Sequence, residues 1–571
     1  MYIESVPNRK SPPCILLRES YRDHGKVCKR TVCNLTDWPP YLVEGLRLAL
    51  KGKAVSTEDF DIVRSRHHGH VAAVLGTLRR VGLDDVLCSR PSRERSLVIA
   101  MIVARVLAPL SKLATARSLN AATGTSTLGE LLDLGKADEN ELYAALDWLL
   151  QRQPHIEKAL AQQRLAEGAM VLYDVTSTYF EGDKCQLAKY GYSRDGKRDR
   201  PQIVFGLLCD AEGCPVAVEV FAGNTTDSTT FNAQVEKVRR RFGIEHVAWV
   251  GDRGMITQAR IADMKEAKGL DWVTALEADQ IRALVADRSL QLSLFDERGL
   301  VEISDPAYPD ERLIACRNPL LAAERAQRRE ELLVATEQQL DYIVAATQRD
   351  KRRLTGSDQI GLRVGRVVGK YNVAKHFRLT ITDDSLRYER DTEKIAREAA
   401  VDGIYVIRTS LPAEALSAPQ AVCTYKSLAQ VERAFRCLKT ISLKVRPINH
   451  WLNDRVRAHV LLCMLAYYVE WHMRRALAPM LFADDDDEAA DLDDCGVVAP
   501  KRPSPRAKAK ASTKQTAEGQ PVHSFATLLA DLTTIVKNTL CWKGPQALTI
   551  EKTTLPTAVQ QRAFELLALK L

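Results

Sequence analysis

An alternation of strand-like and helix-like segments between residues 168 and 276 constrains the fold most. Three strand-like runs come first, and the second and third, in PQIVFGLLCDAEGCPVAVEVF (201–221), flank a DAEG turn. A helical segment, a strand, a second helix and a further strand follow. Elements that alternate in this way pack as helices on a mixed sheet, so we expect an α/β fold.

The composition is that of a globular protein. Hydrophobic residues make up 46% and charged residues 27% of the 571 positions, which excludes a mostly disordered chain and a fibrous repeat. At about 100–200 residues per domain, this length predicts several domains. Lysine and arginine outnumber aspartate and glutamate by 81 to 73, and the resulting net charge of +8 modestly favours an anionic partner.

No segment has the pattern of an export signal or a membrane anchor. The N-terminal residues MYIESVPNRKSPP contain no apolar core of the kind that a signal peptide needs. The most apolar run, VLLCMLAYYVEW (460–471), is too short to span a bilayer and therefore predicts a buried helix. We expect a cytoplasmic protein with no membrane partner.

Changes in composition divide the chain into six expected regions. Residues 14–36 have the pattern of a β-hairpin with a DHGK turn, and residues 40–165 carry apolar positions at helical spacing with many arginines. Residues 320–352 predict a long charged helix, and 359–390 predict strands. The regions are a β-hairpin and helical, DNA-binding N-terminal region (1–165), the first part of a sheet domain (166–276), an insertion of a long helix and strands (277–403), the second part of the sheet domain (404–480), a disordered charged linker (481–521) and a small helical C-terminal piece (522–571).

Three acidic residues occupy positions where chemistry is expected. Asp174 lies in the middle of the apolar strand MVLYDVT, where a buried carboxylate is costly unless a cation compensates it. Asp252 follows another strand, between Gly251 and Arg253, and the glycine allows a close approach. Glu432 lies in YKSLAQVERAFRCLKT (425–440), a predicted helix. Taken singly, an acid at such a position is more often a turn or cap residue than a catalytic one.

The spacing around Glu432 places charges of both signs on one helix face. Glu432, Arg436 and Lys439 fall at i, i+4 and i+7, and Tyr425 either extends this face or precedes the helix cap. Ser427 and Gln430 fit a capping box at the helix start. Such a face suits a phosphodiester, because the acid can hold a metal ion while the cations hold phosphate.

Two strand acids and one helix acid that converge can hold two divalent cations. Two metal ions about 3.5–4 Å apart activate an attacking oxygen and stabilise the leaving one. Oxygen-only ligands favour Mg²⁺ or Mn²⁺ over zinc. The pattern therefore predicts metal-dependent phosphodiester chemistry at Asp174, Asp252 and Glu432.

These motifs resemble those of the DDE transposases of bacterial insertion elements, in the IS-four-like subgroup with a Y-x2-R-x3-E-x6-K motif and a β-rich insertion. The matching segments are LYDVTSTYFEG around Asp174, VGDRGMIT around Asp252, and the helix with Tyr425, Glu432 and Lys439 at the motif spacing. The resemblance extends through GYSRDGKRDRPQIVFGLL, GNTTDSTTF, DGIYVIRT and RPINHW and covers most of residues 14–475.

The resemblance implies an RNase H-like catalytic core, formed by 166–276 and 404–480 and interrupted by a large insertion. It also implies two Mg²⁺ or Mn²⁺ ions held by the three acids, and cleavage of the element's ends followed by joining to target DNA. The implied partners are double-stranded DNA, as terminal inverted repeats and target, and a second copy of the chain in a homodimer. The resemblance therefore also implies a bacterial, nucleoid-associated enzyme.

Several basic and phenolic residues are expected to contact DNA. By the resemblance, Tyr425 and Lys439 contact phosphates near the cleavage site. Lys197, Arg198 and Arg200 lie in KYGYSRDGKRDRPQ (189–202), a loop near Asp174 that we expect to follow the DNA backbone. The complete set of expected DNA-binding residues is Tyr425, Lys439, Arg436, Lys197, Arg198, Arg200 and Arg253.

The sequence departs from the subgroup motif at one position. Leu428 stands where the motif has arginine, so that phosphate contact is absent unless Lys426 or Arg436 supplies it. Residues 277–403 also contain no tryptophan to stack a flipped base in a hairpin intermediate, which leaves Tyr371 or Phe377 as candidates. Two alternatives stay open: an RNase H-like nuclease without strand transfer, and a non-catalytic DNA-binding protein derived from a transposase.

Overall fold

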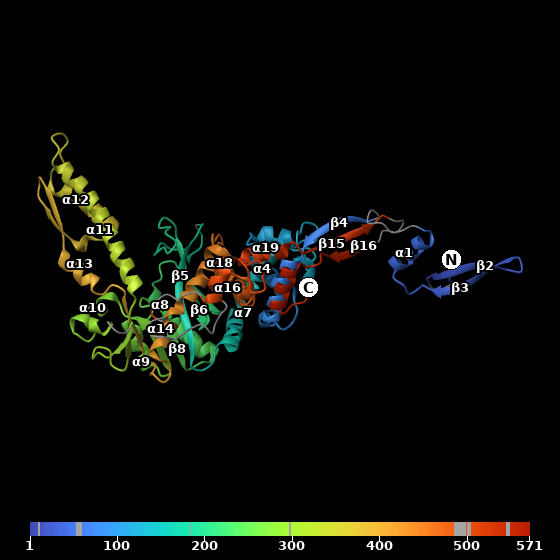
Figure 1. The fold of residues 1–571 in the computed structure, drawn as a ribbon, viewed down its shortest axis with the longest axis horizontal. Coiled ribbons are helices and arrows are strands. Elements are labelled where there is room, and N and C mark those ends of the chain that lie inside the picture. The colour runs from blue at the N-terminus through green and yellow to red at the C-terminus, as the bar shows by residue number, and fades with distance from the viewer. Residues whose placement is uncertain are drawn as a thin grey trace. The chain divides into compact units, whose positions relative to one another are not determined.

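The computed structural model describes residues 1–8, 12–52, 60–182, 184–295, 299–484, 498, 504–543 and 549–571 (Figure 1). Contacts between residues divide the chain into two compact units, which are described separately. Unit 1 consists of Met1–Gly76, Leu113–Asp138 and Ala526–Leu571, and unit 2 consists of Thr77–Lys112 and Glu139–Phe525.

The N-terminal hairpin expected at 14–36 is present and has a third strand. Strand β2 (Cys14–Asp23) pairs antiparallel with β3 (Lys26–Asn34), and β1 (Tyr2–Val6) pairs with the other edge of β2. His24 and Gly25 both have positive φ, at 43° and 80°, which is the backbone of a tight two-residue hairpin turn. The hairpin turn predicted at DHGK is therefore confirmed.

A second sheet of unit 1 joins strands from opposite ends of the chain. Strand β4 (Phe60–His67) pairs with β15 (Val536–Trp542), and β15 pairs with β16 (Thr549–Thr553). The sequence predicts helices over 40–165 and 522–571, so the prediction is wrong for these three strands. Strand β4 has no partner nearby in the sequence, so no local turn signal marks it, and the pairing becomes visible only in three dimensions.

The remaining elements of the N-terminal region, and several elements near the C-terminus, are helices. Helix α16 carries the apolar run at 460–471 and packs against α4 and α7, as the buried-helix prediction requires. The helices are α1 (Pro40–Leu50), α2 (Gly69–Arg80), α3 (Leu83–Leu87), α4 (Arg93–Leu107), α5 (Lys112–Leu119), α6 (Leu128–Leu131), α7 (Glu139–Arg164), α16 (Asn453–Ala476), α19 (Phe525–Thr533) and α20 (Ala558–Leu566).

No single described helix is long and apolar enough to cross a membrane. One pair of helices bent by 105°, Arg93–Leu107 with Lys112–Leu119, passes the same test of length and composition when the two are taken together.

An eight-stranded mixed sheet forms the centre of unit 2, with the order β10-β11-β14-β9-β8-β5-β6-β7. Strands β5, β8 and β9 are parallel to one another, and the remaining pairs are antiparallel. The α/β expectation is confirmed. The strands are β5 (Ala169–Tyr179), β6 (Gln202–Asp210), β7 (Pro215–Ala222), β8 (Val247–Val250), β9 (Leu270–Ala275), β10 (Leu300–Ile303), β11 (Arg312–Arg317) and β14 (Ile404–Thr409).

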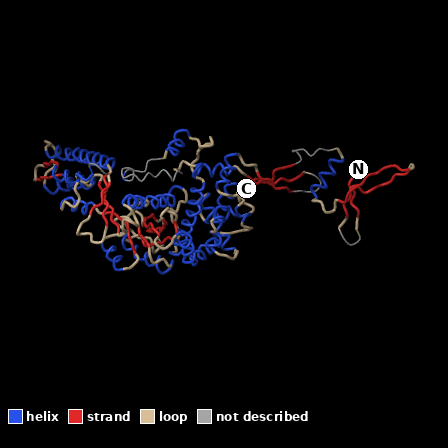
Figure 2. The backbone as a smooth tube through the Cα atoms, turned by 60° about the horizontal axis from the view of Figure 1, so that its bottom comes forward, coloured by secondary structure: helices blue, strands red, loops and turns tan. Residues whose placement is uncertain are grey.

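Helices cover both faces of this sheet (Figures 1 and 2). On one face, Tyr173 of β5 packs against Phe231 of α8 (Asp227–Glu236), with ring centroids 6.5 Å apart. On the other face, Phe205 of β6 meets Phe435 of α15 (Leu428–Arg436) at 5.7 Å. Every residue of β6 is buried, which explains its continuous apolar sequence.

The remaining helices of unit 2 follow the strands that they cover. A π-helical turn, Lys237–Phe242, continues α8, and another, Cys437–Ile441, continues α15. Helix α9 (Gln258–Glu266) connects β8 to β9, and α14 (Ala418–Lys426) follows β14. Short 3-10 turns lie at Leu292–Phe295, Ala374–His376 and Ala478–Met480.

Residues 277–403 contribute both to the large sheet and to a separate cluster. Strands β10 and β11 extend the sheet beyond β14, and α10 (Ala278–Ala286) packs on them. The long helix expected at 320–352 is confirmed as α11 (Pro319–Thr347). Helix α11 shares a second apolar core with α12 (Ser357–Tyr371), β12 (Phe377–Ile381) and β13 (Leu386–Arg390), and α13 (Thr392–Ala399) follows.

The strand expected at the start of 359–390 is wrong. Residues Ser357–Tyr371 form helix α12, in which Ile360, Val364 and Val368 are buried at intervals of four. The high content of β-branched residues favours a strand, but the helical spacing of the buried ones decides the outcome. The strand expectation for the later residues is correct, since β12 and β13 form a hairpin.

The charged linker at 481–521 is only partly described. Residues 485–497 and 499–503, which include most of the acidic run, lie outside the described residues. The basic run that follows forms helix α18 (Pro505–Thr513), which begins at Ser504, whose hydroxyl accepts the backbone N–H of Ala507. This segment was expected to be disordered.

Phe231 tests the packing beneath the sheet. Its fully buried ring contacts Tyr173 and Trp249, the latter with centroids 5.0 Å apart. We expect Phe231→Ala to lower the free energy of unfolding by about 3–5 kcal/mol, through lost burial and the cavity left behind. Urea unfolding followed by circular dichroism measures the change. The exposed neighbour Asn232, changed to Ala, provides a control that should stay within about 0.5 kcal/mol.

Candidate active site

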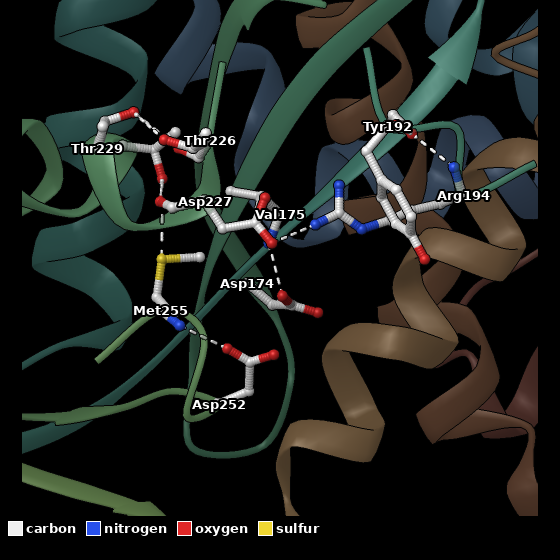
Figure 3. Close-up of polar contacts among 11 residues, drawn as sticks. Asp174, Val175, Tyr192, Arg194, Thr226, Asp227, Thr229, Asp252 and Met255 are labelled. Carbon is white, nitrogen blue, oxygen red and sulfur yellow. Dashed lines mark hydrogen bonds and ion pairs between the residues drawn. The ribbon is translucent and has the colours of Figure 1, made fainter. Parts of the chain in front are cut away.

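The first acid, Asp174, lies on the central strand β5 and is held in an apolar setting. The backbone N–H of Val175 donates to Asp174 Oδ1 at 2.7 Å (Figure 3). Burial, and next the nearby Asp252, raise the pKa of Asp174 to about 7, while the Val175 hydrogen bond and Arg194 act in the opposite direction. The site therefore disfavours a charged Asp174 unless further positive charge is present.

The second acid, Asp252, lies level with Asp174 because of strand register. Strands β5 and β8 are parallel, and Leu172 pairs with Val250, so both aspartates lie two residues beyond a matched pair. The backbone N–H of Met255 donates to Asp252 Oδ1 at 2.7 Å, which fixes the turn after β8 (Figure 3). A Cβ on Gly251 would lie 2.9 Å from Ile256 Cγ1, so this turn requires a residue without a side chain.

The third acid, Glu432, reaches the site from α15. This helix packs on β5, and Phe435 anchors it to Phe205 of β6. Glu432 is exposed and has no hydrogen-bond or ion-pair partner among the described residues. The capping box expected at Ser427 is wrong, because Ser427 makes no side-chain cap and joins α14 to α15. The box lies one helix earlier, where Ser417 and Gln420 start α14.

A cavity of about 440 Å³ brings the three acids together. Arg436 and Lys439, which the helix spacing placed on the face of Glu432, also border it. Acidic and basic groups therefore share one space, as a site for a metal-bound phosphodiester requires. The lining residues are Asp174, Val175, Thr176, Arg194, Asp195, Asp252, Glu432, Phe435, Arg436, Lys439, Thr440 and Arg446.

Lys439 is committed to protein partners. Its buried ammonium donates to the backbone carbonyl of Ser177 and forms an ion pair with Asp195 at 3.1 Å. Asp195 also pairs with Arg446 at 2.7 Å. Burial lowers the pKa of Lys439, and Asp195 opposes that shift. The lysine thus ties the loop before β6 to the helix that carries Glu432.

Tyr425 lies close to the acids but outside the cavity lining. It is half-buried on α14, and burial, followed by the negative charge of Asp252, raises its pKa to about 12. Its hydroxyl is therefore a proton donor rather than a phenolate at neutral pH. Arg253 is exposed beside Asp252 and does not line the cavity either.

The basic loop residues Lys197, Arg198 and Arg200 are all exposed, and none lines the cavity. Their backbone is nevertheless fixed, because the buried side-chain amide of Gln202 donates to the carbonyls of Lys197 and Arg200 at 2.9 and 2.8 Å. The loop presents these three cations from a defined backbone.

Sequence reasoning missed the ion pairs that organise the loop. Arg194 pairs with Asp227 at the start of α8, stacks over the Tyr192 ring, and borders the cavity (Figure 3). Asp195 has the central position between Lys439 and Arg446. Both residues lie in a run of alternating charges, RDGKRDR, in which no local pattern distinguishes the buried pair from the exposed ones.

The donor set suits a hard divalent cation. The three carboxylates offer only oxygen ligands, and burial, followed by the nearby Asp252, disfavours the charged form of Asp174, which a bound cation would favour. Within the described part of the chain, no group of three acidic, histidine or cysteine side chains is already close enough together to hold a metal ion. The residue types fit Mg²⁺ or Mn²⁺.

Two family models match parts of this chain. Residues 168–469 match the model of the transposase DDE domain, which covers more than half of the chain. Residues 3–61 match the N-terminal domain of IS1634 family transposases. No curated protein matches the chain. The chain belongs to the DDE-domain transposases, a family of DNA-binding proteins that depend on divalent metal ions. The matches do not extend to the subgroup motif.

Asp195 provides a test of the loop anchor. Asp195→Ala leaves the buried Lys439 ammonium without its carboxylate, so we expect the free energy of unfolding to fall by about 3–5 kcal/mol. Thermal and urea unfolding measure the loss. Asp199→Ala, at an exposed acid of the same loop, should change stability by less than about 0.5 kcal/mol. Adding Lys439→Met to Asp195→Ala should recover part of the loss, and a double variant as unstable as the sum of both would contradict the pairing.

Proposed function

We propose that this transposase cleaves DNA at the ends of its insertion element and joins those ends to target DNA. The observation that carries the proposal is the convergence of Asp174, Asp252 and Glu432 on one cavity, from two parallel strands in register and one helix. These three side chains would be the catalytic metal ligands.

The sheet supports an RNase H-like core within unit 2. Three consecutive antiparallel strands, β5 to β7, are continued on the free side of β5 by the parallel strands β8 and β9. The strand β14 that follows the insertion lies next to β9, and the segment after it leads into α15 and Glu432. Residues 277–403 would then be an insertion between two parts of the core.

Two Mg²⁺ or Mn²⁺ ions, when bound, would supply charge stabilisation for the attacking and leaving oxygens. The chain's own residues do the rest. Asp174 is oriented by the Val175 N–H and Asp252 by the Met255 N–H, whereas the exposed Glu432 has no such partner among the described residues. Two oriented carboxylates and one exposed helix carboxylate would suit a site that closes when DNA binds.

The exposed basic residues near the cavity are the proposed DNA contacts. Arg436 borders the cavity and is exposed, so it would hold the phosphate beside the cleaved bond and replace the arginine missing at Leu428. The exposed Lys197, Arg198 and Arg200 would contact the backbone further along. Arg253 and Tyr425 would contact DNA beside Asp252. Lys439 acts mainly as a positioning residue through Asp195. Pairing two ends would require a homodimer.

Removal of any one acid should abolish cleavage. We expect Asp174→Ala, Asp252→Ala and Glu432→Ala each to bind end DNA but leave it uncut, because each removes a metal ligand. The assay uses a supercoiled plasmid that carries the gene's native flanks, with Mg²⁺, Mn²⁺ or EDTA. Asp263→Ala, at an exposed acid of α9, should cut normally. A triad variant that cuts at the normal rate would refute the assignment, and cuts that are never joined would favour a nuclease.

Metal binding should be visible without DNA. We expect Mn²⁺ to raise the melting temperature of the wild type, because a cation relieves the repulsion between Asp174 and Asp252. In EDTA, Asp174→Asn should melt higher than the wild type, since it removes a buried charge. The same variant should gain little from Mn²⁺. An equal Mn²⁺ shift in both proteins would show that the ion binds elsewhere.

A further inference from the structure

A second cavity of unit 2, of about 340 Å³, lies next to the candidate active site and is lined by basic residues. It shares Arg446 with the carboxylate-lined cavity, so the two spaces border the same side chain. No carboxylate is among its lining residues. Those residues are Arg105, Pro109, Leu110, Ser111, Lys112, Tyr143, Lys444, Arg446, Pro447, Asn449, His450 and His459.

The inner part of this cavity contains buried positive charge that the protein leaves unbalanced. Lys112 is only 6% exposed and has no hydrogen-bond or ion-pair partner among the described residues. Arg105 is 8% exposed, and among the described residues its guanidinium makes one long hydrogen bond, of 3.4 Å, to the carbonyl of Leu443. A buried ammonium without a partner costs free energy, so an anion that enters the cavity would be bound tightly.

The two histidines that border the cavity are neutral, and the pKa of Lys112 is lowered. Burial, followed by the charges of Lys112 and Arg105, lowers the pKa of His450 to about 4, so this ring is neutral. His459 is likewise held neutral, and its Nε2 bonds the carbonyl of Val445 at 3.0 Å. Burial and the neighbouring Arg105 lower the pKa of Lys112 to about 8. For all three groups burial is the largest cause of the lowered pKa, and the neighbouring positive charges add to it.

We propose that this cavity is a phosphate-binding site for the DNA strand, one or more nucleotides away from the phosphate at the three acids. Buried Lys112 and Arg105 would hold the phosphate oxygens, and the exposed Lys444 at the rim would meet the neighbouring backbone. Arg446, anchored by Asp195, separates the two phosphate positions and fixes their spacing. The inference rests on the proposed action on DNA and adds a strand contact to it.

Lys112→Met tests the site, with Lys158→Met as the matched control. Lys158 is an exposed lysine of α7, so both variants lose one positive charge and gain the same side chain. In buffer without phosphate, Lys112→Met should melt at or above the wild-type temperature, because an unpaired buried charge is removed. Inorganic phosphate, added at constant ionic strength, should raise the wild-type melting temperature by about 2 °C but not that of Lys112→Met. Equal phosphate shifts in both would overturn the site.

The DNA arm measures binding to a linear duplex from the gene's flank in EDTA. Lys112→Met should bind about tenfold more weakly than the wild type, and the slope of log affinity against log salt should fall by about one. Lys158→Met should keep both values. If phosphate stabilises the wild type while DNA affinity and slope stay unchanged in Lys112→Met, the cavity holds a free anion and the DNA contact is refuted. Because no cleavage is measured, a failed catalytic assignment leaves this result interpretable.

Discussion

The structure of unit 2 depends on one unfavourable placement, a carboxylate on the central strand of a sheet that is covered on both faces. Asp174 occupies a position where its neighbours, Tyr173 and Val175, are buried. Its charge is disfavoured there by burial and by Asp252, and the local cation Arg194 is shared with Asp227. The site therefore disfavours a negative charge on Asp174, and a divalent metal ion would offset that charge.

Strand register and helix packing bring the other two acids, Asp252 and Glu432, near Asp174. The pairing of Leu172 with Val250 sets Asp252 level with Asp174, and the packing of Phe435 on Phe205 brings Glu432 over β5. None of these three acids contacts another directly through the chain's own hydrogen bonds. Their convergence is produced by apolar contacts and backbone pairing, so core packing and site geometry are coupled in this protein.

The sequence predicted what local patterns encode and missed what distant pairing decides. The hairpin at 14–36, the long helix after 319 and the α/β alternation from 168 to 276 all have local signals. The pairing of strand β4 has no such signal, since its partner β15 comes from the opposite end of the chain. For the site, Asp174 stood out as a charge in an apolar strand, Asp252 by its position after a strand, and Glu432 by its spacing on a helix. Asp195 and Lys112 became visible only through the residues that surround them.

Unit 2 has two adjacent cavities that differ in the charges of their lining residues, and together they fit a single polyanionic strand. One holds acids and bases together, which suits a phosphate that reacts with metal ions, and the other holds bases alone, which suits a phosphate that is only held. Arg446 belongs to both and is fixed by Asp195, which also holds Lys439. Asp195 thus fixes Lys439 and also Arg446, the residue that both cavities share. Under the proposed function, this anchor would set the spacing between the reacting and the held phosphate.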